Sequence, residues 1–178
     1  MLNLDFAILN AIQGMRSNIL DIIMIIITYI GSTASFWIAS AVVLIYRKKT
    51  RRDGIVIALS MILVLLLGTL LIKNIVMRPR PYNIPEGLLS AADLIIPKPM
   101  GIYSFPSSHS ATAFAAATGI FFLNKKWGLG AYILAALIGF SRLYLYVHFP
   151  TDVLFGAVFG IVCAWLARWI MGKISIPT

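Results

Sequence analysis

Charge is scarce in this chain of 178 residues. Only 12% of its residues are charged, six of them acidic, whereas 60% are hydrophobic and the mean hydropathy is +0.92. A soluble domain of this length usually carries about 25% charged residues. The apolar excess is more than one buried core can absorb, so the composition excludes an ordinary soluble domain and predicts an integral membrane protein.

Cysteine, histidine and acidic side chains are also rare, and these shortages exclude several kinds of site. The single cysteine, Cys163, excludes an intrachain disulfide. Six scattered acidic residues offer no carboxylate cluster for Mg²⁺, so we expect no metal and no cofactor. The positive charges behind the net charge of +9 lie in short clusters between apolar runs, which suits topology signals and lipid headgroups rather than nucleic acid.

Uncharged stretches of the length of membrane helices follow one another along the chain. The clearest is residues 54–72, about 28 Å of helix at ~1.5 Å per residue. Residues 22–46 are also uncharged, but Gly31, Ser32 and Thr33 predict a break there. We therefore expect a single all-α domain over residues 1–178, an integral membrane bundle of about five to six transmembrane helices with an interfacial N-terminal helix. The other expected helices are residues 18–30, 109–124, 127–146 and 151–167.

The positive clusters predict the orientation of this bundle, because cytoplasmic loops carry an excess of lysine and arginine. The loop of residues 77–108 and the turn of residues 147–151 should then lie outside, and no apolar stretch precedes Arg16 that would form a cleavable signal peptide. The segments expected in the cytoplasm are RKKTRRD (residues 47–53), NKKW (residues 124–127), Arg168 and Lys173.

The same clusters give a depth for three polar residues. His109, Arg142 and Asp152 each lie 16 positions along a helix from a cytoplasmic lysine or arginine, about 24 Å at ~1.5 Å per residue. They should share one level slightly below the outer headgroups of the membrane. Ionisable residues at such a depth are functional candidates.

Three segments carry the chemistry at this level. KNIVMRPRP brings a lysine and two arginines to the end of a span, where two prolines stop the helix. FPSSHS supplies a helix start whose N-cap is Ser107 or Ser108 and whose free amides form an anion site. SRLYLYVHFPTD holds an arginine inside an apolar run and a histidine four residues before an aspartate. Taken singly, each has an ordinary structural interpretation as a snorkelling cation, a capped helix or a capping aspartate.

Taken together, the three segments favour chemistry on a phosphate group. Three cations and a helix N-terminus suit a dianion, and two histidines with different partners suit a nucleophile and a proton donor. An aspartate beside a histidine can accept from one ring nitrogen and leave the other as nucleophile or base. The residues alone therefore predict phosphoryl transfer from a lipid, without a metal.

In order and spacing these segments resemble the three motifs of the type 2 phosphatidic acid phosphatase superfamily, membrane lipid phosphatases whose site is shared with vanadium haloperoxidases. The first motif, a lysine, six residues and Arg-Pro, is similar to Lys73 followed by Arg80-Pro81, whereas Arg78 is out of register. The second, Pro-Ser-Gly-His, is similar to residues 106–109.

The third motif of that family, Ser-Arg, five residues, histidine, three residues and aspartate, matches residues 141–152 throughout. One position departs from the family pattern: Ser108 stands where the family usually has a glycine whose backbone approaches the phosphate. A serine amide can still donate there if its backbone conformation is an ordinary one.

The resemblance implies a role for each matched residue. His148 attacks phosphorus and becomes a phosphohistidine, and Asp152 orients it. His109 protonates the leaving oxygen and then activates water for the second step. Spread negative charge in the transition state is met by preorganised donors. The residues implied to hold the phosphoryl oxygens are Lys73, Arg80, Ser107, Ser108 and Arg142.

The resemblance also implies a lipid phosphate as the substrate and the plasma membrane of a bacterium as the location, with an outward-facing site. In the short bacterial members that this chain looks like, the common substrate is undecaprenyl diphosphate. Phosphatidylglycerophosphate, phosphatidate, diacylglycerol pyrophosphate and lipid A phosphate stay open. The outer loop of residues 82–104 is expected to form either an interfacial lid or lipid-facing wall, or a plain packing segment; its apolar residues include Leu88, Leu89, Leu94, Ile95 and Ile96.

Two functions of another class stay open at this point. A small anion carrier would use the cations without releasing phosphate, but it leaves the spacing of His148 and Asp152 unexplained. A non-catalytic binding or scaffold protein would not need the complete catalytic set. Gly156 and Gly160 form a GxxxG pair that suits either a dimer face or packing within the bundle, which we favour, and the oligomeric state stays open.

Overall fold

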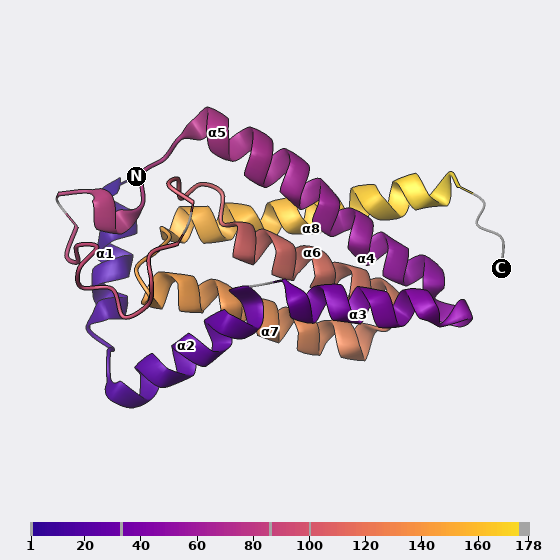
Figure 1. Ribbon diagram of the computed structural model, residues 1–178, viewed down its shortest axis with the longest axis horizontal. Coiled ribbons are helices and arrows are strands. Elements are labelled where there is room, and N and C mark those ends of the chain that lie inside the picture. Colours follow the sequence, from indigo (N-terminus) through magenta and orange to yellow (C-terminus); the bar gives the residue numbers. More distant parts are fainter. Residues whose placement is uncertain (1, 33, 86, 100, 175–178) are drawn as a thin grey trace.

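The computed structural model describes residues 2–32, 34–85, 87–99 and 101–174, and within these ranges every regular element is a helix. Figure 1 shows most of the helices running along the long axis of the molecule, with α1 lying across one end. The helical elements are α1 (Leu2–Gln13), α2 (Asn18–Ser32), α3 (Ser35–Tyr46), η1 (Lys48–Thr50), α4 (Arg51–Leu63), η2 (Val64–Ile72), α5 (Lys73–Val76), η3 (Pro81–Asn83), α6 (Ser108–Leu123), α7 (Lys125–Tyr144) and α8 (Pro150–Gly172).

Several of these helices have the length and composition of membrane spans, which confirms the prediction of an all-α membrane bundle. In the described part of the chain, three helices pass on both counts: the continuous stretch Lys48–Val76, α7 and α8. A fourth span arises if Leu4–Gln13 and Asn18–Gly31, which meet at 119°, are counted as one bent span. Other predicted helices are also present, but they are shorter than the 18 residues taken here as the minimum for a membrane span: α3 has 12 residues and α6 has 16.

The helix that carries the first motif is continuous from α4 through η2 to α5. Its middle part, η2, is a π-helix, a form that occurs frequently at functional sites. The helix ends where Met77 adopts a left-handed conformation (φ 49°) and its N–H donates to the carbonyl of Lys73. It therefore stops two residues before Pro79, in agreement with the expected break.

At the centre of the bundle, α6 is a short helix rich in alanine. Ala111, Ala115 and Ala116 are fully buried, and α6 packs against α4, α7 and α8. A helix surrounded by others needs no polar side, so it shows no amphipathic pattern. The two glycines of the GxxxG pair face it, because a Cβ at Gly156 would meet the carbonyl of Ser107 and one at Gly160 would meet the carbonyl of Ala111. These contacts confirm that the pair packs within the bundle.

The end of the bundle that carries the motif segments is covered by α1 and by the loop after η3. Leu9 and Ile12 of α1 are buried, and the amide of Gln13 donates to the carbonyl of Tyr144 at 2.9 Å. The described residues of the loop form turns rather than a helix; Leu94, Ile95 and Ile96 pack on the same core, whereas Leu88 is exposed. Of the break expected between α2 and α3, Gly31 and Ser32 lie in the last turn of α2, and Thr33 lies outside the described residues.

Candidate active site

A cavity of about 500 Å³ opens at the end of the bundle where α5 ends and α6 begins. It is lined by side chains from all three motif segments and from α2, η2 and the outer loop. The two predicted site residues outside its lining, Ser107 and Asp152, are fully buried. The six predicted site residues that line it are Lys73, Arg80, Ser108, His109, Arg142 and His148.

His148 occupies a buried turn between α7 and α8. The turn is closed by the N–H of Val147, which donates to the carbonyl of Arg142 at 3.2 Å, and by Tyr146 in a left-handed conformation (φ 59°). Burial, reinforced by the nearby positive charge of Arg80, holds the pKa of His148 well below its ordinary value. The imidazole is therefore neutral at neutral pH, as a nucleophile requires.

Asp152 lies one helical turn after His148, at the third position of α8. Its Oδ2 accepts from the N–H of Phe149 at 2.9 Å and lies 3.5 Å from Nδ1 of His148. The four-residue spacing brings the carboxylate close to the imidazole, because His148 immediately precedes the N-cap of α8 and the carboxylate folds back over that cap. Nδ1 of His148 makes no hydrogen bond among the described residues, so the imidazole would have to rotate for Asp152 to accept one from it.

Two arginines are held rigidly beside the imidazole. Arg80 donates from Nε to the carbonyl of Gly101 and from Nη1 to the carbonyl of Val147, both at 2.8 Å, and Nη1 lies 3.4 Å from Nε2 of His148. Arg142 donates from Nη1 to Oγ1 of Thr28 at 2.5 Å, while its buried Nε has no hydrogen-bond partner among the described residues. Both guanidinium groups keep donors available for an anion in the cavity.

The start of α6 forms the other side of the site. Ser107 is the N-cap, its Oγ accepting from the N–H of Ser110 at 3.5 Å, and its own N–H donates to the carbonyl of Asp152 at 3.2 Å. The backbone of Ser108 does not adopt a positive φ, and its hydroxyl forms a hydrogen bond with Oγ1 of Thr69 at 3.0 Å. Serine therefore replaces the usual glycine here without backbone strain. His109, partly buried, reaches the same cavity from the first turn of α6.

The structure adds residues that the motifs did not identify. Arg78 was visible but out of register, and Lys98 stands between two prolines of the outer loop, yet nothing in the sequence marked either as part of the site. Two of the others come from helices remote in sequence and the third lies one turn before Lys73 in the same helix, and none of the three carried a signal. These additional residues are Asp5, Thr28, Thr69, Arg78 and Lys98.

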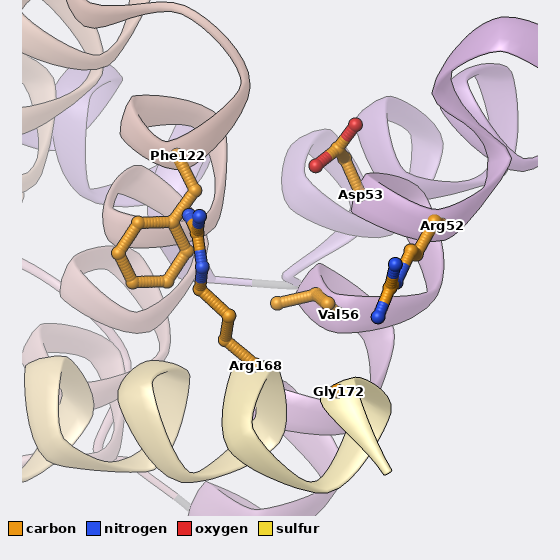
Figure 2. A pocket seen from close by; sticks show the side chains of 6 residues that line it. All are labelled: Arg52, Asp53, Val56, Phe122, Arg168 and Gly172. Atoms are coloured by element: carbon orange, nitrogen blue, oxygen red, sulfur yellow. The ribbon is translucent and has the colours of Figure 1, made fainter. Parts of the chain in front are cut away.

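A second hollow, of about 280 Å³, lies at the opposite end of the bundle. Figure 2 shows Arg168 reaching toward Phe122 on one side of it, and Arg52 and Asp53 extending from α4 on the other. The guanidinium of Arg168 lies 4.4 Å from the ring centroid of Phe122, and Arg52 donates to the carbonyl of Met171 at 2.9 Å. The positive residues expected on the cytoplasmic side thus gather away from both histidines.

The model of the PAP2 superfamily matches residues 53–176. The chain is 30% identical to the undecaprenyl-diphosphatase BcrC of Bacillus subtilis, over 92% of this chain and 82% of that protein. It is 31% identical to an undecaprenyl-diphosphatase of Sulfolobus acidocaldarius, over 74% of this chain but only 60% of that protein.

Two solved structures share the fold over nearly the whole chain. One is a transmembrane PAP2 type phosphatidylglycerolphosphate phosphatase from Bacillus subtilis, with a TM-score of 0.78 and 29% identity over 98% of this chain and 87% of that one. The other is Aquifex aeolicus LpxE, with a TM-score of 0.75 and 29% identity over 90% of this chain and 92% of that one.

Proposed function

This chain belongs to the PAP2 superfamily and groups with membrane lipid phosphatases, and we therefore propose that it hydrolyses a lipid diphosphate through a phosphohistidine intermediate, without a metal. We propose undecaprenyl diphosphate as the substrate and the extracytoplasmic side of a bacterial plasma membrane as the location of the site. The observation that carries the chemistry is the convergence of His148, His109 and three cations on one cavity.

In the first step, Nε2 of His148 attacks the terminal phosphorus and the bond from phosphorus to the bridging oxygen breaks. In this step the Nδ1–H of His148 donates to Asp152, whose Oδ2 lies 3.5 Å from Nδ1, and the carboxylate stabilises the positive charge that develops on the ring. His109 donates a proton to the leaving oxygen, so that the lipid departs as its monophosphate. The buried, neutral state of the imidazole supports its role as nucleophile.

In the second step, His109 accepts a proton from a water molecule, which attacks the phosphohistidine. The bond between phosphorus and Nε2 breaks, inorganic phosphate leaves, and both histidines return to their starting states. The net reaction consumes one water molecule and releases one phosphate. His109 acts first as acid and then as base, as microscopic reversibility of such a displacement requires.

The charge on the transferred group is met by fixed donors. Arg80 and Arg142 are oriented by carbonyl and hydroxyl groups, so they need little reorganisation when the charge shifts. Lys73 adds a third positive charge, and the first amides of α6 add dipoles of the same sign. Loss of one such donor typically costs ~10²–10³ in rate.

A fourth cation favours a diphosphate as the substrate. Lys98 lines the same cavity from the outer loop, it is exposed, and no ion pair holds it within the described residues. The three motif cations suffice for the transferred phosphoryl group. Lys98 would then meet the second phosphate, which stays on the lipid as the leaving group and which a simple monophosphate ester lacks.

The test is phosphate release by the purified protein in detergent with EDTA, across undecaprenyl diphosphate, phosphatidylglycerophosphate and phosphatidate. We expect release to be fastest from the diphosphate, and replacing His148 with alanine should abolish it. A strict Mg²⁺ requirement, or near-normal turnover in His148→Ala, would contradict the mechanism.

The substrate assignment is tested with Lys98→Gln, which should lower kcat/KM for the diphosphate about tenfold while changing the monophosphates less. Lys125→Gln, an exposed lysine at the opposite end of the bundle, is the matched control and should behave like the wild type. Equal losses on mono- and diphosphates would overturn the assignment of Lys98 to the second phosphate.

A further inference from the structure

A buried carboxylate outside all three motifs touches the region of the nucleophile. Asp5 in α1 is only 2% exposed, and an isolated charge at such a position is costly unless it is paired. Its Oδ2 accepts from Nη2 of Arg78 at 2.6 Å and from Oγ1 of Thr151 at 2.8 Å. Its Oδ1 accepts from the N–H of Thr151 at 3.1 Å. Asp5 therefore connects α1 to the first turn of α8, where Asp152 lies.

Arg78 is the link between the two carboxylates. Its Nη1 donates to Oδ1 of Asp152 and to Oγ1 of Thr151, both at 2.7 Å, while Nη2 donates to Asp5. The guanidinium also stacks on Phe149, 3.9 Å from the ring centroid. Arginine is suited to this place because its planar fork meets two acceptors in a fixed geometry, which a lysine ammonium does not.

We propose that Asp5 and Arg78 are positioning residues that hold the Asp152 carboxylate ionised and turned toward His148. The inference rests on the proposed function, since it concerns the nucleophile of that reaction. Asp152 uses Oδ2 for the N–H of Phe149 and for the approach to Nδ1 of His148. Arg78 occupies the other oxygen, so the carboxylate is fixed at both ends.

The consequence of losing either partner follows from charge. Without Arg78, the fully buried Asp152 loses its counter-ion, so the carboxyl group can take up a proton or rotate. A protonated Asp152 no longer accepts the Nδ1–H of His148, and the ring nitrogen that attacks phosphorus is no longer fixed.

Asp5 acts one step further away. It balances the positive charge of Arg78, which lies in the same end of the bundle as the cations of the cavity, and it holds the Arg78 fork in place. It also supplies an acceptor for the start of α8, because the N-cap residue Phe149 has no side-chain acceptor for the free amides there.

The experiment compares Asp5→Asn, Arg78→Gln and the double variant with the wild type, using folded protein in detergent and undecaprenyl diphosphate as the substrate. Each single change should lower kcat by about tenfold or more while KM stays within about threefold, because the network acts on the nucleophile and not on lipid binding. The double variant should lose little more than the worse single variant, because both act on one carboxylate. Arg78→Lys keeps the positive charge but lacks the planar guanidinium, so it should recover part of the rate. If Arg78→Gln does not fold, Arg78→Lys is the variant used for the test.

A second ion pair at the same end of the bundle provides the matched control. Arg16 and Asp21 lie 3.4 Å apart, and Asp21 accepts from the hydroxyl of Tyr144, with no contact to Asp152. Arg16→Gln and Asp21→Asn should leave kcat unchanged even if they lower the melting temperature.

Wild-type kcat in folded Asp5→Asn and Arg78→Gln, or losses that multiply in the double variant, would overturn the inference. A wild-type protein that releases no phosphate from any lipid refutes the proposed function instead, so the two failures are distinguishable.

Discussion

Replacing Gly156 with alanine should damage the site by moving the start of α6. A Cβ at this position would lie 2.7 Å from the carbonyl oxygen of Ser107 and 3.3 Å from Cβ of Ser110. An ordinary contact begins at 3.4 Å, so the two backbones must separate by about 0.7 Å. Ser107 is the N-cap of α6, and its N–H is bonded to the carbonyl of Asp152. The shift therefore falls on the first amides of α6, which we propose face the phosphate, and on the turn that carries His148.

We expect a large loss of kcat and only a small loss of unfolding free energy. A misplacement of about 1 Å can cost 10²-fold in rate, so a shift of this size should lower kcat by about 10- to 100-fold. Overpacking costs about 1–3 kcal/mol of unfolding free energy, and the better helix propensity of alanine returns about 1 kcal/mol. The net loss of about 0–2 kcal/mol corresponds to a fall in Tm of no more than about 8 °C.

The assay is kcat for phosphate release beside a melting curve in the same detergent. Gly130→Ala is the matched control in α7, because no atom lies within 4 Å of its added Cβ; its kcat should equal that of the wild type. Gly160→Ala meets the carbonyl of Ala111, one turn deeper, so it should lower Tm with less effect on kcat. A Gly156→Ala protein that keeps both wild-type kcat and wild-type Tm would show that the contact between α6 and α8 does not constrain the site.

Four further outcomes are expected. Because burial and Arg80 hold the pKa of His148 well below its ordinary value of 6.5, kcat/KM should not decrease as the pH falls through 6.5 and should drop only at lower pH; an acidic limb at 6.5 or above would contradict this. The unfolded chain takes up that proton first, so Tm should also fall as the pH drops below 6.5. Vanadate should inhibit in competition with the lipid, by mimicking the five-coordinate transition state in the cavity, and activity that persists in millimolar vanadate argues against the assigned site. Thr28→Val should lower kcat/KM by about tenfold or more, because Arg142 loses the acceptor of its charged hydrogen bond, whereas Thr28→Ser should not; equal behaviour of the two variants would exclude that bond.

The helices were predictable because each follows from local features of the chain. Residues 54–72 carry no charge and lie within the observed helix Lys48–Val76, and Ser107, one of the two expected caps, is the N-cap of α6. Spacing within one segment also anticipated the approach of Asp152 to His148, since one helical turn separates them. Such features depend on neighbours in the sequence, which a pattern records directly.

Contacts between distant segments could not be predicted in this way. Thr28 meets Arg142 across 114 positions, and Asp5 meets Thr151 across 146. Both depend on how α1 and α2 fold over the end of the bundle that carries the motif segments, where the chain bends by 119° between the two helices. The sequence indicated an interfacial N-terminal helix without showing what this helix covers.

Arg78 lies inside the first motif segment but at no motif position, and we propose that the reaction depends on it. Register assigned the phosphate-binding position to Arg80, which has the motif spacing and lines the cavity. Arg78 donates to Asp152, and it does not line the cavity. Arg80 lies beside Nε2 of His148, whereas Arg78 holds the carboxylate that approaches Nδ1. Two arginines of one Arg-Pro-Arg-Pro stretch therefore contact the two sides of the His148–Asp152 pair.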